Sequence, residues 1–508
     1  MRRSKLVALL VAVGVAVLPP VLGPVPAHAA TCSAPFRYAP TSNSIYVTGA
    51  TTPVTLTSIR EGCSSAPLEL VDPASKTWQL NADIQLEAGS TLNLHGGPGG
   101  DVGTLRLRSG SAGTLDVVSI TAQYGTVSIK DTTITSWDPA TNAVDTDANI
   151  PAGGVRGRAF IRALSILEGN TPRTSTMDIV NSDLGYLGFF GPESYGVAYK
   201  ARGCGVDTPA VCDALGVLGK QIGSKFHHNF MGTYTWGADG MEFSGNEYFA
   251  NISYGLDPHD NSDYLLIKNN KMYDNGNHGL ICSVACDHLT ITDNEVTNNG
   301  QTPYVAPGDP DPGDNQVHGI MLHRGITDSV VKNNTVRGHT TGAGIAVFDS
   351  VGNTVEGNTV TGNRFGLRFS VGTRGTVVSG NSVTDSSSHA LFAFKGNNPA
   401  IYTGTSGRPA DIVFTGNTFT GSGAELFKVQ DADRFTFKGG QIGGTMALGP
   451  LFERAQGHVY EASVSTPAGT NFTLRGTVAV TTDATFAGMR ADEIAVTKYA
   501  HSTATFTG

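Results

Sequence analysis

Charge, long apolar runs and helical periodicity are all scarce in this chain, and each scarcity excludes a class of protein. Only 15% of the 508 residues are charged, and the formal net charge is −9, whereas domains that bind nucleic acid are usually basic. Beyond residue 22 no apolar run is long enough to cross a bilayer. We therefore expect no nucleic-acid partner and no membrane insertion, while a local cationic groove for an anionic ligand remains compatible with an acidic surface.

Cysteine is sparse as well, with six residues in the chain. An even number in an exported protein permits disulfides. Proximity favours Cys32–Cys63, Cys204–Cys212 and Cys282–Cys286, although the sequence leaves the connectivity open. No second close pair of Cys or His completes a zinc site, and the three carboxylates in residues 308–314 lack the ligand spacing of an EF-hand. We expect no metal and no cofactor.

The N-terminal residues have the pattern of a secretory leader. Three cations within residues 2–5 precede an apolar run over residues 6–22, and residues 27–29 (AHA) offer small side chains for cleavage. We expect residues 1–29 to be a signal peptide, and the mature chain to be secreted and monomeric.

A repeat built on glycine is the most informative feature that the chain does contain. Seven segments share a glycine followed by alternating side chains, with the glycines at positions 196, 232, 255, 279, 319, 344 and 366. From position 232 onward the glycines are 23, 24, 40, 25 and 22 residues apart. A leucine-rich repeat has a similar period but needs leucines at fixed offsets. Short strands with no helical periodicity predict an all-β fold, a right-handed parallel β-helix with coils of about 23 residues.

Asparagine repeats with the same period. It follows a β-branched or aromatic run at positions 246, 270, 294, 334, 358, 381 and 417, and stacked asparagines can form hydrogen-bonded ladders between coils. The long gap before position 334 contains residues 301–316, whose Pro, Gly and Asp content is typical of a loop. We expect an N-terminal β cap over residues 30–80, the β-helix over 81–420, and C-terminal coils or a β cap over 421–508.

Alternation along each strand assigns its side chains to two faces. The first and third residues after each glycine are mostly apolar and should face the core. The second and fourth should face outward in two columns, which read Ala198, Tyr234, Asp257, Ile281, Met321, Ala346, Arg368 and Lys200, Trp236, His259, Ser283, His323, Phe348, Ser370. Cationic, aromatic and imidazole side chains along one sheet predict a groove for a long, flat, acidic ligand.

The histidines of this groove suggest chemistry. His259 and His323 should lie two coils, or about 10 Å, apart, which is too far to share one metal ion or one proton. Asp257 is close enough to His259 to orient its ring or raise its pKa. Pro258 is unusual within a strand, because an interior proline cannot donate a hydrogen bond to the neighbouring strand. Such departures from local rules tend to occur at functional sites.

The segment YGLDPHD at residues 254–260 resembles the signature of the mannuronan C-5-epimerases, which convert mannuronate to guluronate within alginate. Further segments resemble the periplasmic branch of this family in the same order along the chain: residues 135–138, 158–161, 181–188, 193–197, 318–324 and 328–329. The resemblance implies a right-handed parallel β-helix that acts on an anionic uronate polysaccharide, without a metal ion.

The resemblance also implies roles for individual residues. His259 would be the base, Tyr254 the opposing acid or base, Asp257 the carboxylate that orients His259, and Asp260 a polar signature position. The family's arginine, which neutralises the substrate carboxylate, is expected on the next coil, where this chain has Val284. Either an extra coil moves the arginine one repeat along, to Arg324, or Lys200 or Arg368 neutralises the carboxylate; we predict that Arg324 takes this part. The expected substrate-binding residues are Lys200, Trp236, Asp260, His323 and Arg368.

Two other functions remain open. A polysaccharide lyase begins with the same proton abstraction and then expels O-4, and the outcome depends on where the acid lies by fractions of an ångström. The substrate of either enzyme could be another uronan, such as a glucuronate polymer. A non-catalytic carbohydrate-binding β-helix would need the aromatic side chains of Trp236 and Phe348, but neither His259 nor Tyr254.

Overall fold

The computed structural model describes residues 32–110, 116–147, 157–305, 317–421, 427–444 and 451–460, with six short strands between residues 463 and 506. The expected signal peptide (residues 1–29) and the acidic segment at residues 308–314 lie outside the described residues.

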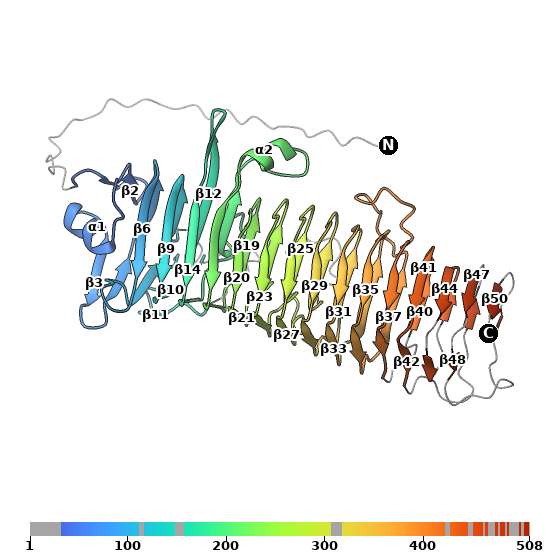
Figure 1. Ribbon diagram of the computed structural model, residues 1–508. Helices are drawn as coiled ribbons and strands as arrows, with labels where there is room; N and C mark the ends of the chain where they lie inside the picture. The colour runs from blue at the N-terminus through green and yellow to red at the C-terminus, as the bar shows by residue number, and fades with distance from the viewer. Residues whose placement is uncertain are drawn as a thin grey trace, which may run out of the picture.

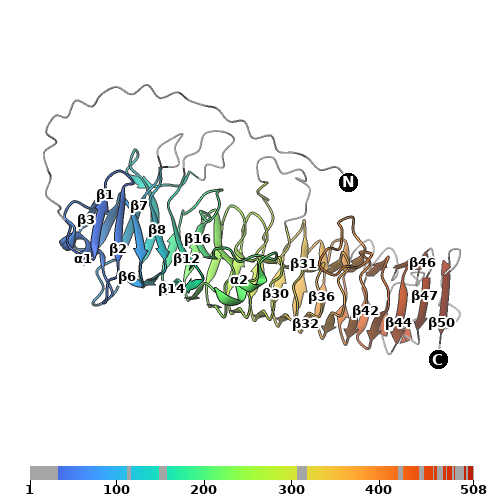
Figure 2. The same cartoon turned by 90° about the horizontal axis from the view of Figure 1, so that it is seen from above.

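The chain winds into a parallel β-helix, in which successive coils stack along one axis (Figures 1 and 2). The coils contribute strands to three long sheets, in which neighbouring strands pair in parallel apart from four antiparallel pairs in the N-terminal part of the chain. The colour therefore passes from blue to red along the molecule in Figure 1. A residue on one coil lies beside its counterpart about one repeat later, as Trp236 does beside His259.

The first sheet carries the glycine segments, and we call it the groove sheet. Its strands are β1 (Phe36–Ala39), β2 (Ser44–Thr48), β5 (Asp83–Glu87), β8 (Ser119–Gln123), β12 (Phe160–Glu168), β13 (Thr171–Arg173), β16 (Gly196–Ala201), β19 (Met231–Trp236), β22 (Leu256–His259), β25 (Leu280–Ser283), β28 (Ile320–His323), β31 (Ala343–Phe348), β34 (Phe365–Ser370), β37 (His389–Phe394), β40 (Phe427–Gln430), β43 (Leu451–Glu453), β46 (Thr473–Arg475) and β49 (Thr497–Lys498).

The second sheet consists of β3 (Leu68–Asp72), β4 (Thr77–Leu80), β7 (Thr104–Arg108), β10 (Thr133–Asp138), β11 (Ala143–Val144), β15 (Asp183–Gly185), β18 (Lys225–His227), β21 (Glu247–Phe249), β24 (Lys271–Tyr273), β27 (Glu295–Thr297), β30 (Thr335–Arg337), β33 (Thr359–Thr361), β36 (Ser382–Thr384), β39 (Thr418–Phe419), β42 (Gln441–Gly443), β45 (Ser463–Ser465) and β48 (Thr485–Phe486).

The third sheet consists of β6 (Ser90–His95), β9 (Gly125–Lys130), β14 (Thr176–Val180), β17 (Leu218–Ile222), β20 (Glu242–Ser244), β23 (Leu266–Lys268), β26 (Thr290–Thr292), β29 (Val330–Lys332), β32 (Thr354–Glu356), β35 (Val377–Ser379), β38 (Val413–Thr415), β41 (Phe435–Lys438), β44 (Gln456–Tyr460), β47 (Val478–Thr482) and β50 (Ser502–Phe506).

Two short helices interrupt this pattern. Helix α1 (Leu56–Gly62) lies at the N-terminal end of the molecule in Figure 1, begins with a capping box between Thr55 and Ser58, and buries Leu56 and Ile59. At the same end, β1 runs antiparallel to β2 and closes one edge of the groove sheet. Helix α2 (Pro209–Ala214) belongs to the loop after β16. Within the described residues, neither helix has the length and hydropathy of a membrane span.

Apolar side chains from all three sheets fill the interior. The first and third residues after the glycines belong to this continuous core, as shown by Leu256, Leu280, Ile320, Leu322 and Leu367, each completely buried. Outward residues instead form smaller clusters on the surface of the groove sheet, such as Ile281 with Met321 and Ala346. The two faces predicted from alternation are therefore confirmed.

Asparagines stack from coil to coil, as the sequence predicted. Asn270 is typical: its Oδ1 accepts hydrogen bonds from the backbone N–H and the side chain of Asn246, and its Nδ2 donates to Asn294 Oδ1 and to the Phe243 carbonyl. A second ladder, which the sequence analysis did not identify, runs through Asn229, Asn251, Asn275, Asn299, His339 and Asn363. Both ladders satisfy buried backbone groups at the turns, where sheet pairing stops.

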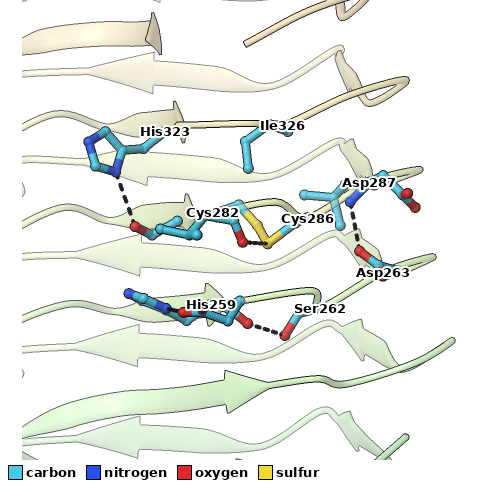
Figure 3. Close-up of a disulfide and its surroundings, with 12 residues drawn as sticks. His259, Ser262, Asp263, Cys282, Cys286, Asp287, His323 and Ile326 are labelled. Atoms are coloured by element: carbon cyan, nitrogen blue, oxygen red, sulfur yellow. Dashed lines mark hydrogen bonds and ion pairs between the residues drawn. A yellow bond between two sulfur atoms is a disulfide. The ribbon is translucent and has the colours of Figure 1, made fainter. Parts of the chain in front are cut away.

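The three cysteine pairings favoured by proximity are present. Disulfides join Cys32 to Cys63, Cys204 to Cys212, and Cys282 to Cys286. In the last of these, both cysteines are completely buried in the core, Cys282 in β25 and Cys286 just after this strand (Figure 3).

Removal of one ladder side chain should weaken the coil stack. We expect Asn270→Ala to lower the free energy of unfolding by about 2–3 kcal/mol, because it leaves buried donors of Asn246 without their acceptor. The matched control is Lys271→Ala at the adjacent exposed position, which should change the free energy by less than about 0.5 kcal/mol. Urea unfolding followed by circular dichroism gives both values, and equal effects would contradict a stabilising ladder.

Candidate active site

A groove of about 830 Å³ lies along the outer face of the groove sheet. It extends from β22 to β40, seven strands in succession, which corresponds to about 29 Å at the usual strand spacing. Its lining residues include Tyr254, His259, His278, Ser283, His318, Met321, His323, Phe348, Arg368, Phe394 and Lys395. The groove that the sequence predicted on this face is therefore present.

The strand register produces both outward columns in the predicted order. In the first, Ala198 pairs with Tyr234, Tyr234 with Asp257, and Met321 with Ala346, which in turn pairs with Arg368. In the second, Trp236 pairs with His259, His259 with Ser283, and Ser283 with His323. His259 and His323 are thus two coils apart, with the coil that holds Cys282 between them (Figure 3).

His259 is placed by the end of its strand and by the turn that follows. Pro258, which has no N–H, lies between the two registered pairs of β22 and β25. Asp260 and Asn261 have φ values of 31° and 53°, so the chain turns sharply, and the Ser262 hydroxyl donates to the His259 carbonyl over 2.7 Å. This turn brings the Asp260 carboxylate against His259 Nδ1, where the two form a hydrogen bond.

The hydrogen bond that His259 Nδ1 donates to Asp260 defines the tautomer of the imidazole. Burial lowers the pKa of His259, but this bond and the negative charges of Asp257 and Asp260 outweigh it, and the net shift is upward. An Nδ1–H that donates to the carboxylate leaves Nε2 as the basic nitrogen. The His259 side chain is 29% exposed, so this nitrogen is accessible from the groove.

The hydrogen-bond partner of His259 Nδ1 is Asp260, whereas the resemblance gave the orienting role to Asp257. Its side chain is 2% exposed, its Oδ1 has no hydrogen-bond partner, and the bond to Nδ1 comes from Asp260. Burial raises the pKa of Asp257 to about 7, with His259 opposing and Asp260 adding to the shift. The reason is geometric: Asp257 lies within the strand beneath the groove, whereas the turn carries Asp260 back toward the ring.

Aromatic side chains continue the groove on the N-terminal side of His259. Trp236 stacks on His259, with ring centroids 5.5 Å apart and planes at 15°. Lys200 also contacts Trp236, with its Nζ 4.2 Å from the ring centroid. The same Nζ forms an ion pair of 3.4 Å with Glu193. Lys200 and Trp236 therefore extend the site beyond the lining residues of the main groove.

Tyr254 lines the other edge of the groove and stacks on His278, which sequence reasoning did not single out. The two rings are nearly parallel, with centroids 5.6 Å apart, and His278 is followed by His318 at 5.2 Å. All three residues directly precede a repeat glycine. That shared position was the sequence signal that could have identified His278 and His318 as a third column.

His323 differs from His259 in its electrostatics. Its Nδ1 lies 3.1 Å from the Ser283 hydroxyl, and burial, with the nearby Arg324 and His259, lowers its pKa to about 3. It is therefore a neutral hydrogen-bonding group at neutral pH, and the two histidines lie two coils apart, as their spacing in the sequence predicted.

Of the two arginines expected at the groove, Arg368 contributes to its lining and Arg324 lies beside it. Among the described residues Arg324 is not part of the groove lining; its guanidinium lies 5.7 Å from the Phe348 ring centroid, and its buried Nε has no hydrogen-bond partner. It follows β28 with a φ of 64°, and its guanidinium lies beside the groove-lining Phe348. Arg368 lines the groove, because it lies within β34 and points outward.

No metal centre is visible in the parts of the chain that the structure describes, since they contain no group of three or more His, Cys, Asp or Glu placed to bind an ion.

Residues 218–309 match the family of right-handed β-helix regions, and residues 313–422 match a family described as periplasmic copper-binding protein (NosD). The crystal structure of the periplasmic alginate epimerase AlgG superposes with a TM-score of 0.62 at 18% identity, covering 82% of this chain and 85% of that one. The fold class is thus confirmed as a right-handed parallel β-helix.

The resemblance to the mannuronan C-5-epimerases is confirmed by sequence relatives. A mannuronan C5-epimerase of Pseudomonas putida is 27% identical over 244 residues, which are 47% of this chain and 40% of the relative. One of Pseudomonas fluorescens is 30% identical over 149 residues, which are 29% of this chain and 25% of the relative. The matched segments therefore span less than half the length of these relatives.

The pKa of His259 can be tested without a substrate, through the fluorescence of Trp236. A protonated imidazole stacked on an indole quenches its emission more strongly than a neutral one. We expect a fluorescence titration with a midpoint above 6.5, the usual value for histidine, and a lower midpoint in Asp260→Asn, which loses the charge that raises the pKa. Trp236→Phe is the control and should remove the transition; an unchanged midpoint in Asp260→Asn would contradict the assigned hydrogen bond.

Proposed function

We propose that this chain is an exported polysaccharide epimerase that converts β-D-mannuronate to α-L-guluronate in an alginate-type polymer. The observation that carries the proposal is the His259 imidazole, held by Asp260 at Nδ1 and accessible at Nε2 from a long groove. The named relatives support the reaction class, and the three disulfides suit an oxidising compartment outside the cytoplasm.

The reaction needs a base, an acid and stabilisation of the developing charge. His259 Nε2 takes the proton from C-5, the C–H electron pair moves into the carboxylate, and the anion is held until a proton returns to C-5 from the opposite face. Tyr254, on the other edge of the groove, or a water molecule beside it, supplies that proton. No atom is gained or lost, so the product differs from the substrate only in configuration at C-5.

Asp260 serves this reaction as the partner of His259. A carboxylate at Nδ1 fixes the tautomer in which Nε2 is the acceptor, and it stabilises the imidazolium that forms when C-5 loses its proton. Asp257, buried below the groove, adds negative charge near His259 without bonding to it. Both carboxylates therefore make His259 a stronger base than an isolated histidine.

The groove has the length and lining of a polymer-binding site. It passes over seven strands, and Trp236 and Lys200 continue it past His259. Imidazole, aromatic and cationic side chains alternate along it, which suits sugar rings that carry carboxylates. A uronate lyase would use the same base. Because Val284 occupies the position of the family's arginine, lyase activity is the second candidate function.

Product analysis separates the two reactions. With polymannuronate in deuterated water, we expect proton NMR to show guluronate with deuterium at C-5 and no shortening of the chain. The variant His259→Ala should lose about 10²–10⁴-fold in kcat, because it removes the general base, while it still binds the polymer. His288→Ala, an exposed histidine bonded to Asp287 on a turn, is the matched control and should remain active. Unsaturated chain ends would identify a lyase, and full activity in His259→Ala would contradict the proposal.

The pH profile distinguishes the two carboxylates. A base must be neutral to act, so kcat/KM should fall as the pH drops through the pKa of His259, which lies above its ordinary value. Asp260 raises the pKa of His259 more than Asp257 does. The acid limb of the kcat/KM profile should therefore move to lower pH by more in Asp260→Asn than in Asp257→Asn. A larger shift in Asp257→Asn would return the orienting role to Asp257.

A further inference from the structure

We propose that Tyr402 binds the polymer on the C-terminal side of His259, as the tip of a loop that forms a wall of the groove. We call residues 395–412, which connect β37 to β38, the wall loop. Asp349 is the positioning residue that holds Tyr402 in place. The inference rests on the proposed function for the identity of the polymer, whereas the geometry of the wall does not depend on the reaction.

The wall loop belongs to the edge of the groove sheet where Asp260 lies. It starts directly after β37, and Asp260, Arg324 and Asp349 likewise come directly after β22, β28 and β31. Since these strands stack in parallel register, the residues that follow them lie along one edge. Residues 395–398 contribute to the groove lining. In Figure 1 the wall loop is the orange loop that rises above the coils beside β37.

The wall loop is bent back along the axis toward His259. Two coils before β37, Asp349 holds the loop: its Oδ2 accepts a hydrogen bond from the Tyr402 N–H over 3.1 Å. Its Oδ1 accepts from the N–H and the hydroxyl of Thr403, over 3.0 and 2.9 Å. One coil nearer to His259, the Tyr402 ring lies on Gly325, with Cδ1 2.7 Å from the place that a Cβ of residue 325 would occupy. The tip of the loop therefore reaches three coils back from its own strand.

Two features fix the position of Tyr402. Asp349 is completely buried, and a buried carboxylate is costly unless it is hydrogen-bonded, so the donors of the loop stabilise it. Gly325 has a φ of 75° and no Cβ that would displace the ring. The tip is therefore held in one position before a ligand binds, which lowers the entropic cost of binding.

The Tyr402 hydroxyl lies close to the charged groups of the catalytic edge. Burial raises the pKa of this hydroxyl, the negative charge of Asp260 raises it further, and Arg324 opposes the shift. The hydroxyl therefore keeps its proton at neutral pH and can donate it to a sugar oxygen. Since Asp260 is the hydrogen-bond partner of His259, Tyr402 lies within electrostatic reach of the catalytic pair.

A second loop approaches Tyr402 from the N-terminal side. It consists of residues 202–217, between β16 and β17, and the charge of its Asp207 also acts on the Tyr402 hydroxyl. A disulfide crosslinks this loop, and the Trp236 Nε1–H donates to its Cys204 carbonyl over 2.6 Å. The two loops therefore bound the edge of the groove on both sides of the catalytic turn.

The tip of the wall loop has the chemistry that a sugar requires. Ile401, next to Tyr402, is 59% exposed. A sugar ring presents C–H groups together with hydroxyl groups, and a tyrosine offers an apolar ring with a polar end. Such a neutral contact, away from C-5, binds mannuronate and guluronate residues alike. It therefore contributes affinity for the polymer rather than rate at the reacting carbon.

The test measures binding and turnover separately in the full chain. A mannuronate oligomer long enough to fill the groove is titrated by calorimetry into the His259→Ala protein, which does not convert it. In this background we expect Tyr402→Ala to weaken binding by about tenfold, and Tyr402→Phe, which keeps the ring, by about threefold. In the active protein Tyr402→Ala should raise KM and leave kcat within about twofold, because the contact is present in ground state and transition state alike.

Tyr273→Ala is the matched control. Tyr273 is also partly exposed, but it belongs to β24 on the second sheet, outside the groove lining, so its removal should change binding by less than about twofold. Unchanged affinity in Tyr402→Ala, or an equal loss in Tyr273→Ala, would overturn the binding role of Tyr402.

Asp349 is tested through its effect on Tyr402. Asp349→Asn keeps the shape of the side chain but sets an NH₂ group against a donor of the loop, so it should weaken binding by about threefold. The same change should have little further effect in Tyr402→Ala. Thr403→Val, which removes one of the three bonds from the side of the loop, gives the same comparison if Asp349→Asn does not fold. Equal losses with and without the Tyr402 ring would overturn the positioning role.

The two proposals fail separately. Oligomer binding that depends on Tyr402, in a protein that produces neither guluronate nor cleaved chains, would reject the epimerase and retain the wall. Conversion of polymannuronate with unchanged KM in Tyr402→Ala would retain the epimerase and reject the wall.

Discussion

The parallel register of the coils is the constraint on which the rest of the structure depends. Since each coil is paired with the next at a fixed register, one residue position in the repeat becomes a column on the surface. The asparagine ladders hold that register at the turns. A slip of one residue would turn His259 into the core and Pro258 outward, so the stability of the stack and the geometry of the groove have the same origin.

Within this frame, local surroundings give one residue type several functions. His259 has a carboxylate at Nδ1 and becomes a base, whereas His278 and His318 accept backbone N–H groups at Nδ1 and become neutral donors. His339 replaces an asparagine in a ladder and has a structural part. What each imidazole can do follows from the partner of its Nδ1 atom, because that partner determines where the proton resides.

The sequence predicted the fold, both outward columns and the place of His259, because period and alternation determine which residues share a face. It could not predict the partner of His259, since the turn at Asp260 and Asn261 depends on backbone angles that no spacing reveals. For the same reason the spacing could not give the position of the Arg324 guanidinium, which lies 5.7 Å from the ring centroid of the groove-lining Phe348. The predicted columns contain only residues that follow a repeat glycine. His278 and His318 directly precede such a glycine, so the alternation did not reveal their column.

The central claim is that a uronate in the groove presents C-5 to position 259. A crystal structure of His259→Gln with a bound mannuronate oligomer tests it most directly. The account predicts one sugar with C-5 within about 3.5 Å of the substituted side chain and its carboxylate directed to the opposite edge of the groove. An oligomer bound on another face, or one with every C-5 turned away from position 259, would contradict it.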